Sequence, residues 1–389
     1  GQFLLEWSRR VRHAVVDLSQ PGRLFEDLGV TYVGPVPGHD LVALDNTLRA
    51  ALEEEDAPII VHVRTRKGYG YRPAETDKVG FHGAALPPMP ELAESPAADD
   101  VVPGNGEASP SAQERRARKA PNYTAVMSEE LVRIAEEDPR VVAITAGMPT
   151  GTGVAAFGER FPERTYDVGI AEQHAMTMAA GMALAGQRPF VALYSTFLQR
   201  AFDQVIHDVC QNDAPVVIGI DRAGLVGEDG TSHQGMFTLS ALRQLPNLVL
   251  AAPRDEQQLR RLLRTAFEQQ HPFALQYPRD AGFDLPPADP QPLEVGRGEV
   301  LREGSEILII GLGPIVARGA TVAQRLEDAG WSVALVDARF ARPLDRQLIL
   351  QQARGKQLIV TLEESVLAGG FGSAVLEVLA DASEDTAAV

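Results

Sequence analysis

The fold is decided around residues 216–235, which read VVIGIDRAGLVGEDGTSHQG. The first five are apolar or glycine, as in a strand that is buried on both faces of a parallel sheet. The next fifteen hold four glycines, one arginine, three acidic residues and a histidine. Such a loop is too polar for a core and too rich in glycine for a helix. We therefore expect a functional loop at the carboxyl end of a buried strand, where open α/β sheets bind ligands. The alternative is a surface loop without function.

Strands and helices alternate on both sides of this segment. Helical stretches separate five strand candidates, at 141–145, 190–194, 216–220, 248–252 and 273–277. This pattern predicts the α/β class, with a doubly wound, mostly parallel sheet. A second α/β series begins near Glu306, with strands at 307–310, 332–336 and 358–360 and helices at 315–329 and 371–380.

The N-terminal residues differ from this pattern. Apolar spacing predicts an amphipathic helix over 4–19, followed by a Pro/Gly-rich loop at 34–40, a helix at 41–54 and a strand at 58–63. Residues 86–119 hold six prolines and a basic run, which is typical of an exposed linker. The sequence therefore predicts four parts. Residues 1–85 are the end of an α/β domain, 86–120 are a linker, 121–283 are a complete α/β domain and 284–389 are an incomplete one.

Charge and cysteine content exclude several classes of function. The net charge of −17 disfavours nucleic acids and anionic membranes as partners. The single cysteine, Cys210, excludes an intrachain disulfide and a cysteine-based zinc site, which fits a reducing cytoplasm. Apolar runs are shorter than the ~20 residues that a membrane helix needs, and no signal peptide opens the chain. We expect a cytoplasmic protein.

Five further residues are candidates for chemistry. Glu172 opens a helix rich in small residues, where the helix dipole alone also favours an acid. Tyr194 and Phe197 follow a strand and can form an aromatic wall for a flat heterocycle, or simply pack in the core. Arg279 ends another strand, where its guanidinium can bind a phosphate through two hydrogen bonds. A loop histidine, His82, is by itself more typical of an idle surface residue.

Taken together, these segments resemble the 1-deoxy-D-xylulose-5-phosphate synthase family, which are transketolase-like enzymes that use thiamine diphosphate. The resemblance extends over essentially the whole chain. It depends most on AEQHA at 171–175, DRAG at 221–224, HQG at 233–235 and GGFGS at 369–373. It implies a pyrimidine-binding domain at 121–283, a transketolase-type C-terminal domain after it, and part of a diphosphate-binding domain at 1–85.

The resemblance also implies roles for individual residues. Glu172 would hydrogen-bond the aminopyrimidine ring of the cofactor, and Phe197 would stack on that ring. Tyr71 and Lys67 would lie beside the cofactor. His82, His233 and Asp229 would act on the reacting groups as catalytic residues. The acceptor substrate would be bound by Arg222, Arg279 and Tyr194.

The implied reaction joins pyruvate to D-glyceraldehyde 3-phosphate and releases carbon dioxide. The implied assembly is a homodimer, with thiamine diphosphate and Mg²⁺ as cofactors. The sequence has no Gly-Asp-Gly, so we expect the Mg²⁺ ligands in a preceding segment and the isolated chain to be inactive. Two positions depart from the family pattern: Thr231-Ser232 replaces Pro-Thr before His233, and Asp280 replaces the glycine after Arg279.

Three other readings stay open at this point. Another thiamine-diphosphate enzyme, either a transketolase or the beta subunit of a 2-oxoacid dehydrogenase, would share most of these features. A Rossmann oxidoreductase is suggested by Gly311 and Gly313 after a strand, with Asp337 further on, although Pro314 breaks the fingerprint. A non-catalytic α/β interaction module would keep the cleft without the chemistry.

Overall fold

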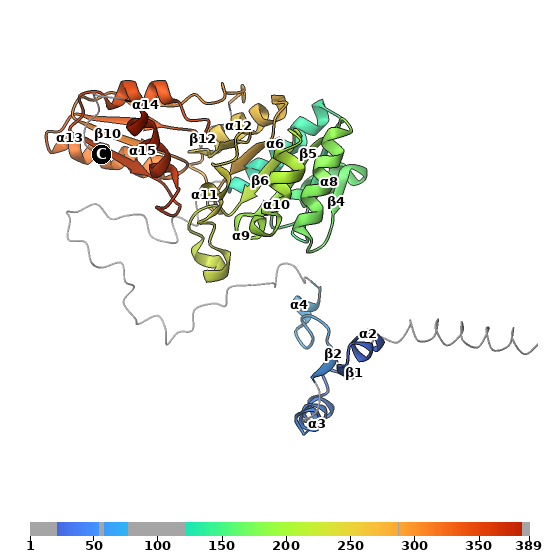
Figure 1. The fold of residues 1–389 in the computed structure, drawn as a ribbon. Coiled ribbons are helices and arrows are strands. Elements are labelled where there is room, and N and C mark those ends of the chain that lie inside the picture. Colours follow the sequence, from blue (N-terminus) through green and yellow to red (C-terminus); the bar gives the residue numbers. More distant parts are fainter. Residues whose placement is uncertain (1–21, 54–57, 77–120, 287, 383–389) are drawn as a thin grey trace, which may run out of the picture. The chain divides into compact units, whose positions relative to one another are not determined.

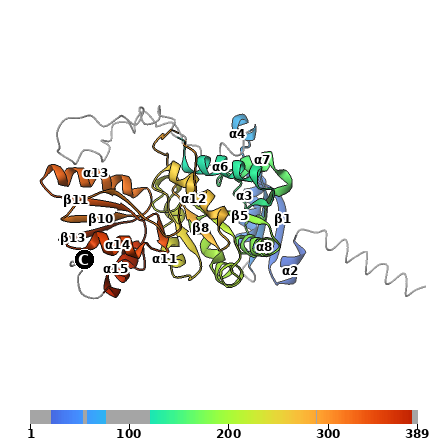
Figure 2. The same cartoon turned by 90° about the horizontal axis from the view of Figure 1, so that it is seen from above.

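A computed structural model describes residues 22–53, 58–76, 121–286 and 288–382 (Figures 1 and 2). The chain falls into two compact units, Gly1–Glu107 and Ala108–Val389, and each is described by itself. The helix predicted at 4–19 and the linker at 86–120 lie outside the described residues. Within the described part of the chain, no helix has the length and apolar character needed to span a membrane.

The first unit contains a β-α-β crossover. Strands β1 (Thr31–Pro37) and β2 (Ile59–Arg64) are parallel, and helix α3 (Leu41–Leu52) connects them. The Asp40 carboxylate caps α3 by accepting hydrogen bonds from the amides of Val42 and Ala43 at 3.1 and 3.0 Å. Two short helices, α2 (Arg23–Asp27) and α4 (Arg72–Thr76), flank this crossover.

The loop predicted at 34–40 is wrong in its first half, because residues 34–37 continue β1. Prolines are tolerated there since β1 pairs with β2 alone and leaves its other edge unpaired in the described sheet. The helix predicted at 41–54 corresponds to α3.

The second unit is built around a seven-stranded sheet with the order β12-β7-β8-β6-β5-β3-β4. All neighbouring strands are parallel except β12, which is antiparallel to β7. The strands are β3 (Val141–Thr145), β4 (Thr165–Asp167), β5 (Arg188–Tyr194), β6 (Val217–Asp221), β7 (Val249–Ala251), β8 (Phe273–Gln276) and β12 (Phe340–Arg342).

Helices cover both faces of this sheet, as the α/β prediction requires. On β5, Phe190 and Ala192 face a cluster with α6 (Tyr123–Glu137), α7 (Val154–Arg160) and α12 (Glu256–Glu268). Val191 and Leu193 face the opposite cluster, with α8 (Glu172–Leu184), the π-helix η4 (Val205–Cys210) and α11 (Thr238–Leu242). This alternation buries each strand on both sides, and the doubly wound fold is confirmed.

A four-stranded sheet, ordered β13-β10-β11-β9, lies beside the first within the same unit. Three of its strands are parallel, and β9 is antiparallel to β11. Figure 2 shows α13 on one side of this sheet and α14 and α15 on the other. The elements are β9 (Glu299–Arg302), β10 (Ile307–Gly311), α13 (Ile315–Asp328), β11 (Val333–Asp337), α14 (Arg346–Ala353), β13 (Leu358–Leu362) and α15 (Phe371–Asp381).

The chain crosses from one sheet to the other between β11 and β12. At this crossing Asp337 is fully buried, and its Oδ2 lies 3.0 Å from Arg254 Nη1 and accepts a hydrogen bond from Gln258 Nε2 at 2.8 Å. Arg254 belongs to the segment between β7 and α12, and Gln258 lies in the first turn of α12. The two sheets are therefore joined by the two-residue connection between β11 and β12 and by the ion pair of the buried Asp337 with Arg254.

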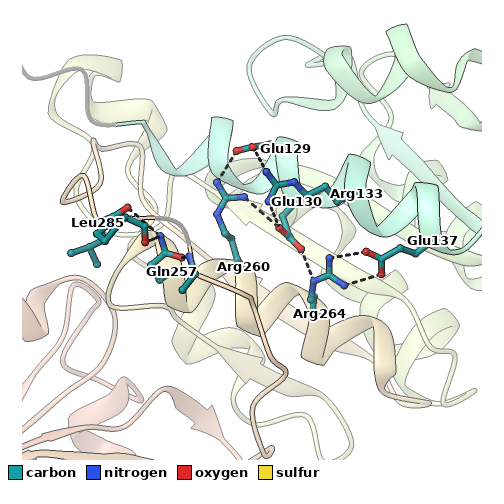
Figure 3. A network of polar contacts seen from close by, with 10 residues as sticks. Glu129, Glu130, Arg133, Glu137, Gln257, Arg260, Arg264 and Leu285 are labelled. Carbon is teal, nitrogen blue, oxygen red and sulfur yellow. Dashed lines mark hydrogen bonds and ion pairs between the residues drawn. The ribbon is translucent and has the colours of Figure 1, made fainter.

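Helices α6 and α12 are locked together by a network of arginines and glutamates (Figure 3). Its centre is Glu130, which is fully buried and lies 2.6 Å from Arg264 Nε and 3.3 Å from Arg260 Nη1. Arg264 also binds Glu137 through two hydrogen bonds, and Arg260 binds Glu129 at 2.7 Å. The hydrogen bonds from these arginines lower the pKa values of Glu129 and Glu137.

We predict that Glu130→Ala lowers the free energy of unfolding by about 3–5 kcal/mol, because it leaves two largely buried arginines without their shared counter-ion. Urea denaturation measures this loss. The control is Glu136→Ala on the same helix, whose half-exposed carboxylate lies 3.2 Å from Arg160 and should contribute about 1 kcal/mol or less. Equal losses in the two variants would contradict the prediction.

Candidate active site

The candidate site lies at the carboxyl ends of the strands of the seven-stranded sheet. In the sheet, β4 lies on one side of β3 and β5 on the other, so the strand order reverses at β3. Ligands of open α/β sheets bind in the crevice at such a reversal. Each candidate residue of the second unit lies at or after the end of a strand: Glu172 after β4, Tyr194 and Phe197 at β5, Arg222, Asp229 and His233 after β6, and Arg279 after β8.

Glu172 is the first residue of α8 and is only 2% exposed. Its Oε2 atom is buried and has no hydrogen-bond partner among the described residues. Arg200 Nη1 lies 3.3 Å from this oxygen, but Arg200 is itself about half exposed. A buried carboxylate oxygen without a hydrogen bond is costly, so this atom indicates that a donor is to be supplied from outside the described chain. The first-turn position also agrees with the helix dipole.

Two aromatic rings and a histidine line the neighbouring strand end. The rings of Tyr194 and Phe197 are stacked, with centroids 5.8 Å apart and planes 19° apart. The His233 ring meets Phe197 edge-on at 5.3 Å. Thr196 donates a hydrogen bond to the carbonyl of Ser232 at 3.0 Å, which ties the segment after β5 to the loop that carries His233. Phe197 therefore lies between Tyr194 and His233, as an aromatic wall requires.

The loop at 221–235 is shaped by its own hydrogen bonds. Gly224 and Gly235 pair through two backbone bonds of 3.1 and 2.9 Å. The Gln234 side chain accepts from the amide of Val226 at 2.8 Å and donates to the carbonyls of Val226 and Gly230 at 2.7 and 2.9 Å. These contacts close the loop on itself and fix the positions of Asp229 and His233 within it.

Arg222 is held from several directions. Its guanidinium lies 3.7 Å from the centre of the Tyr194 ring, its Nε donates to Asp229 at 3.0 Å and its Nη1 donates to the carbonyl of Gly151 at 2.9 Å. Its backbone has a φ of 60°, in the left-handed region that costs a non-glycine residue about 1–3 kcal/mol. The surrounding contacts keep Arg222 in this conformation.

The carboxylate of Asp229 joins the two candidate phosphate ligands. One of its oxygens pairs with Arg222 and the other with Arg279 Nη1. Both arginines line a cavity of about 1160 Å³ between α6, α7 and the sheet edge. Asp280, which departs from the family pattern, lines the same cavity, and its Oδ1 accepts a hydrogen bond from the amide of Ala281 at 2.8 Å.

Asp221 forms an ion pair with the neighbouring Arg222. Asp221 is fully buried, and its Oδ1 lies 3.1 Å from Arg222 Nη1. Its Oδ2 accepts a hydrogen bond from Thr124 Oγ1 at 2.7 Å. Burial raises the pKa of Asp221 from its ordinary 3.8 to about 6, although Arg222 and Thr124 act in the opposite direction. Burial likewise raises the pKa of Tyr194.

The structure thus brings together the candidate residues of the second unit that form the aromatic wall and the arginine pair, which are Tyr194, Phe197, Arg222, Asp229, His233 and Arg279. Glu172 joins them through Arg200, which follows Phe197 by three residues. Lys67 and Tyr71 belong to the first unit, in the turn between β2 and α4, so their roles stay predictions. His82 lies outside the described residues, and its role stays a prediction too.

Sequence reasoning assigned no role to Gly151, Thr124, Asp221 or Arg200. The available signal for the first of these was the Thr-Gly-Thr-Gly run at 150–153, in the loop that follows the predicted strand at 141–145, since glycine-rich turns after strands mark ligand loops. Asp337 is the acidic residue on which the Rossmann oxidoreductase alternative depends. Its carboxylate accepts hydrogen bonds from Arg254 and Gln258. It does not face a nucleotide cleft, which weighs against that reading.

Comparison with known proteins gives three family models that match the chain. They are the transketolase pyrimidine-binding domain over residues 119–283, the transketolase C-terminal domain over 296–388, and 1-deoxy-D-xylulose-5-phosphate synthase over 1–65. The 1-deoxy-D-xylulose-5-phosphate synthase of Syntrophus aciditrophicus (strain SB) is 48% identical over 382 residues, which cover 97% of this chain and 56% of that protein.

Two further relatives agree with these matches. The 1-deoxy-D-xylulose-5-phosphate synthase 1 of Geobacter sulfurreducens is 46% identical over 98% of this chain and 57% of that protein. A solved structure described as a split gene transketolase, inactive beta4 tetramer, has a TM-score of 0.61 and 34% identity, over 68% of this chain and 87% of that one. The chain spans a little over half the length of the curated relatives it matches.

The two α/β sheets, the site at the strand reversal and these matches define a protein of the transketolase class. Within that class, the chain belongs to the 1-deoxy-D-xylulose-5-phosphate synthase family.

The buried Asp221 predicts a pH dependence of stability. Because its pKa is raised on folding, the folded state binds the proton more tightly, and this site's contribution to stability falls as pH rises from about 4 to about 6. Asp221→Asn has no proton to lose. The difference in unfolding free energy, wild type minus variant, should therefore decrease over that window and level off above it. Urea denaturation between pH 4 and 8 measures it, and a difference independent of pH would refute the assignment.

Proposed function

We propose that the full-length protein is a thiamine-diphosphate-dependent transferase that condenses pyruvate with D-glyceraldehyde 3-phosphate. The products are 1-deoxy-D-xylulose 5-phosphate and carbon dioxide, the first step of non-mevalonate isoprenoid synthesis, which also feeds thiamine and pyridoxal synthesis. Membership in the family implies the cofactor. The single observation that carries the proposal is the buried Glu172 oxygen without a hydrogen bond, after the end of a strand in the same sheet whose strand ends carry the aromatic wall and the arginine pair.

The residues present fit thiamine diphosphate. A protonated ring nitrogen of the aminopyrimidine would give Glu172 Oε2 the donor it lacks, and Phe197 is proposed to stack on the aminopyrimidine. Lys67 and Tyr71 are proposed to lie beside the cofactor. When bound, the cofactor supplies a carbon nucleophile and accepts the electrons released with carbon dioxide. Glu172 would hold the proton at the ring nitrogen, because a carboxylate shielded from water shares a proton readily.

The other end of the site fits a phosphorylated acceptor. The guanidinium groups of Arg222 and Arg279 would bind the phosphate, since planar donor forks match its oxygens. Tyr194 would orient Arg222 from below, and Asp229 would orient both arginines toward the acceptor. His233 lies against Phe197 and is proposed to move a proton at the acceptor carbonyl, with His82 as a second acid or base.

We propose the same organisation of the chain as the sequence suggested. Residues 1–85 would complete the diphosphate-binding domain, 86–120 would link it to the pyrimidine-binding domain at 121–283, and 284–389 would belong to the C-terminal domain. Mg²⁺ would bind with the cofactor diphosphate through ligands that lie outside this chain. The protein is proposed to act in the cytoplasm as a homodimer.

The surface around α8 supports the homodimer. This helix is rich in small residues, and Gly181 and Leu184 are exposed on it. Ile170, just before the helix, is 79% exposed and Leu184 is 62% exposed. Small residues let helices approach closely, and apolar ones favour burial, so the face suits a second copy of the chain.

We predict that Glu172→Gln in the full-length protein lowers kcat by about 10²- to 10⁴-fold, because the amide cannot share a proton with the ring nitrogen. Steady-state formation of 1-deoxy-D-xylulose 5-phosphate measures this. Glu130→Gln is the control, since it alters another fully buried carboxylate in the α6–α12 network and should change stability rather than kcat. Nearly unchanged turnover in Glu172→Gln would remove the proposed role.

Product analysis separates the proposed reaction from its rivals. Incubated with pyruvate and D-glyceraldehyde 3-phosphate, the full-length protein should release one carbon dioxide for each 1-deoxy-D-xylulose 5-phosphate. A transketolase would instead need a ketose donor, and a 2-oxoacid dehydrogenase subunit would decarboxylate pyruvate without using the aldehyde. A non-catalytic module would give neither product, and any of these three outcomes would overturn the proposal.

A further inference from the structure

We propose that Gly151 is a positioning residue of the acceptor site, and that its lack of a side chain allows Arg222 and Tyr194 to form the phosphate-binding arrangement. The inference rests on the proposed function and deepens it, because it names a residue that determines the preference for phosphorylated acceptors. Gly151 lies in the loop between β3 and α7, far in sequence from both partners.

Gly151 contacts each partner in a different way. Its carbonyl accepts a hydrogen bond from Arg222 Nη1 at 2.9 Å. Its α-carbon faces the phenol of Tyr194 so closely that an added Cβ would lie 1.8 Å from Tyr194 Oη and 2.9 Å from Tyr194 Cζ. A side chain at position 151 therefore cannot coexist with the observed position of Tyr194.

The backbone itself does not require glycine at this position. Gly153, two residues on, has a φ of +75° in the left-handed region, but Gly151 is not among the residues of positive φ. An alanine could adopt the Gly151 backbone without strain. The requirement for glycine thus comes from the approach of Tyr194 alone, and this makes it a property of the site rather than of the turn.

Displacing Tyr194 would disturb the arginine directly. The Tyr194 ring supports the Arg222 guanidinium at 3.7 Å, and the Gly151 carbonyl fixes one edge of the same group. A guanidinium binds phosphate through donors in a rigid plane, so a tilt of that plane weakens the interaction. Since Asp229 links Arg222 to Arg279, the second arginine would lose its alignment too.

The effect should be confined to the anion-binding end of the site. Thr150, Gly151 and Gly153 line the same cavity as Arg222 and Arg279. The carboxylate of Glu172 pairs instead with Arg200, on the segment after β5. A change at position 151 is therefore expected to impair phosphate recognition more than decarboxylation of pyruvate.

The test is a double-mutant cycle in the full-length protein, with Gly151→Ala, Tyr194→Phe and the two combined. Each variant is assayed with D-glyceraldehyde 3-phosphate and with unphosphorylated D-glyceraldehyde, and the ratio of the two kcat/KM values is compared. Gly158→Ala, in neighbouring α7, is the matched control, because its added Cβ would meet only Thr165 at 3.3 Å. Calorimetric titration with inorganic phosphate measures the anion site without turnover.

We expect Gly151→Ala to lower the ratio of kcat/KM for D-glyceraldehyde 3-phosphate to kcat/KM for D-glyceraldehyde by about tenfold or more. Phosphate binding should weaken in parallel. The size of the effect is that of coupling between residues in contact. In the Tyr194→Phe background the contact of 1.8 Å with the hydroxyl is gone and only the contact of 2.9 Å with Cζ remains, so the same change should lower the ratio by less than about threefold. Gly158→Ala should leave the ratio unchanged.

Three outcomes would overturn the inference. One is an equal loss of kcat/KM with both aldehydes in Gly151→Ala. A second is a decrease of the kcat/KM ratio that persists fully in the Tyr194→Phe background. A third is unchanged phosphate binding in a folded Gly151→Ala variant. Failure of the proposed function is distinguishable, because the wild-type protein would then form no condensation product with either aldehyde. The titration with phosphate would still test Gly151 in that case.

Discussion

The site depends on how Arg222 is held at the end of β6. The arginine occupies a left-handed backbone conformation, which an unsupported residue would leave at a gain of about 1–3 kcal/mol. It stays because Asp221 pairs with it, Tyr194 stacks beneath it, Gly151 accepts from it and Asp229 fixes its outer edge. These four partners come from the ends of three neighbouring strands, so the sheet must form before the site can.

The same arrangement explains why the two ends of the site differ. At the arginine end, Asp229 pairs with Arg222 and Arg279, and Asp221 pairs with Arg222, although the buried Asp221 Oδ1 has no hydrogen bond among the described residues. At the other end, Glu172 is buried with one oxygen lacking a hydrogen bond. We propose that the first end accepts an anion by exchange of partners, and that the Glu172 oxygen, which lies beside a half-exposed Arg200, takes a hydrogen-bond donor from a bound molecule. The coenzyme proposed above would supply that donor.

Much of this could be predicted from the sequence, for a physical reason. Buried parallel strands leave continuous apolar runs, so β3, β5, β6 and β8 were readable, and polar residues directly after such runs must gather at one edge of the sheet. The short strands β4, β9 and β12 were missed because each contains a charged residue within three or four positions, which interrupts the apolar run that marks β7 and β8. The β1 strand was partly missed because its glycine and prolines imitate a turn.

The role of Gly151 could not be read from sequence either, since it follows from the position of a phenol on another strand. Asp221 was visible within its motif, but only its burial and its contact with Thr124 distinguish it from an ordinary loop acid. Contacts between segments separated by 97 residues, as in that pair, leave no local pattern in one sequence.

The strand β12 has a consequence for the order in which the protein can mature during synthesis. It pairs with β7 at the edge of the seven-stranded sheet. The ribosome synthesises it about 90 residues after β7. Until then, β7 presents an unpaired row of peptide groups, which other nascent chains can recognise. Asp337 belongs to the same later part of the chain, so its contacts with Arg254 and Gln258, which connect the two sheets, can also form only then.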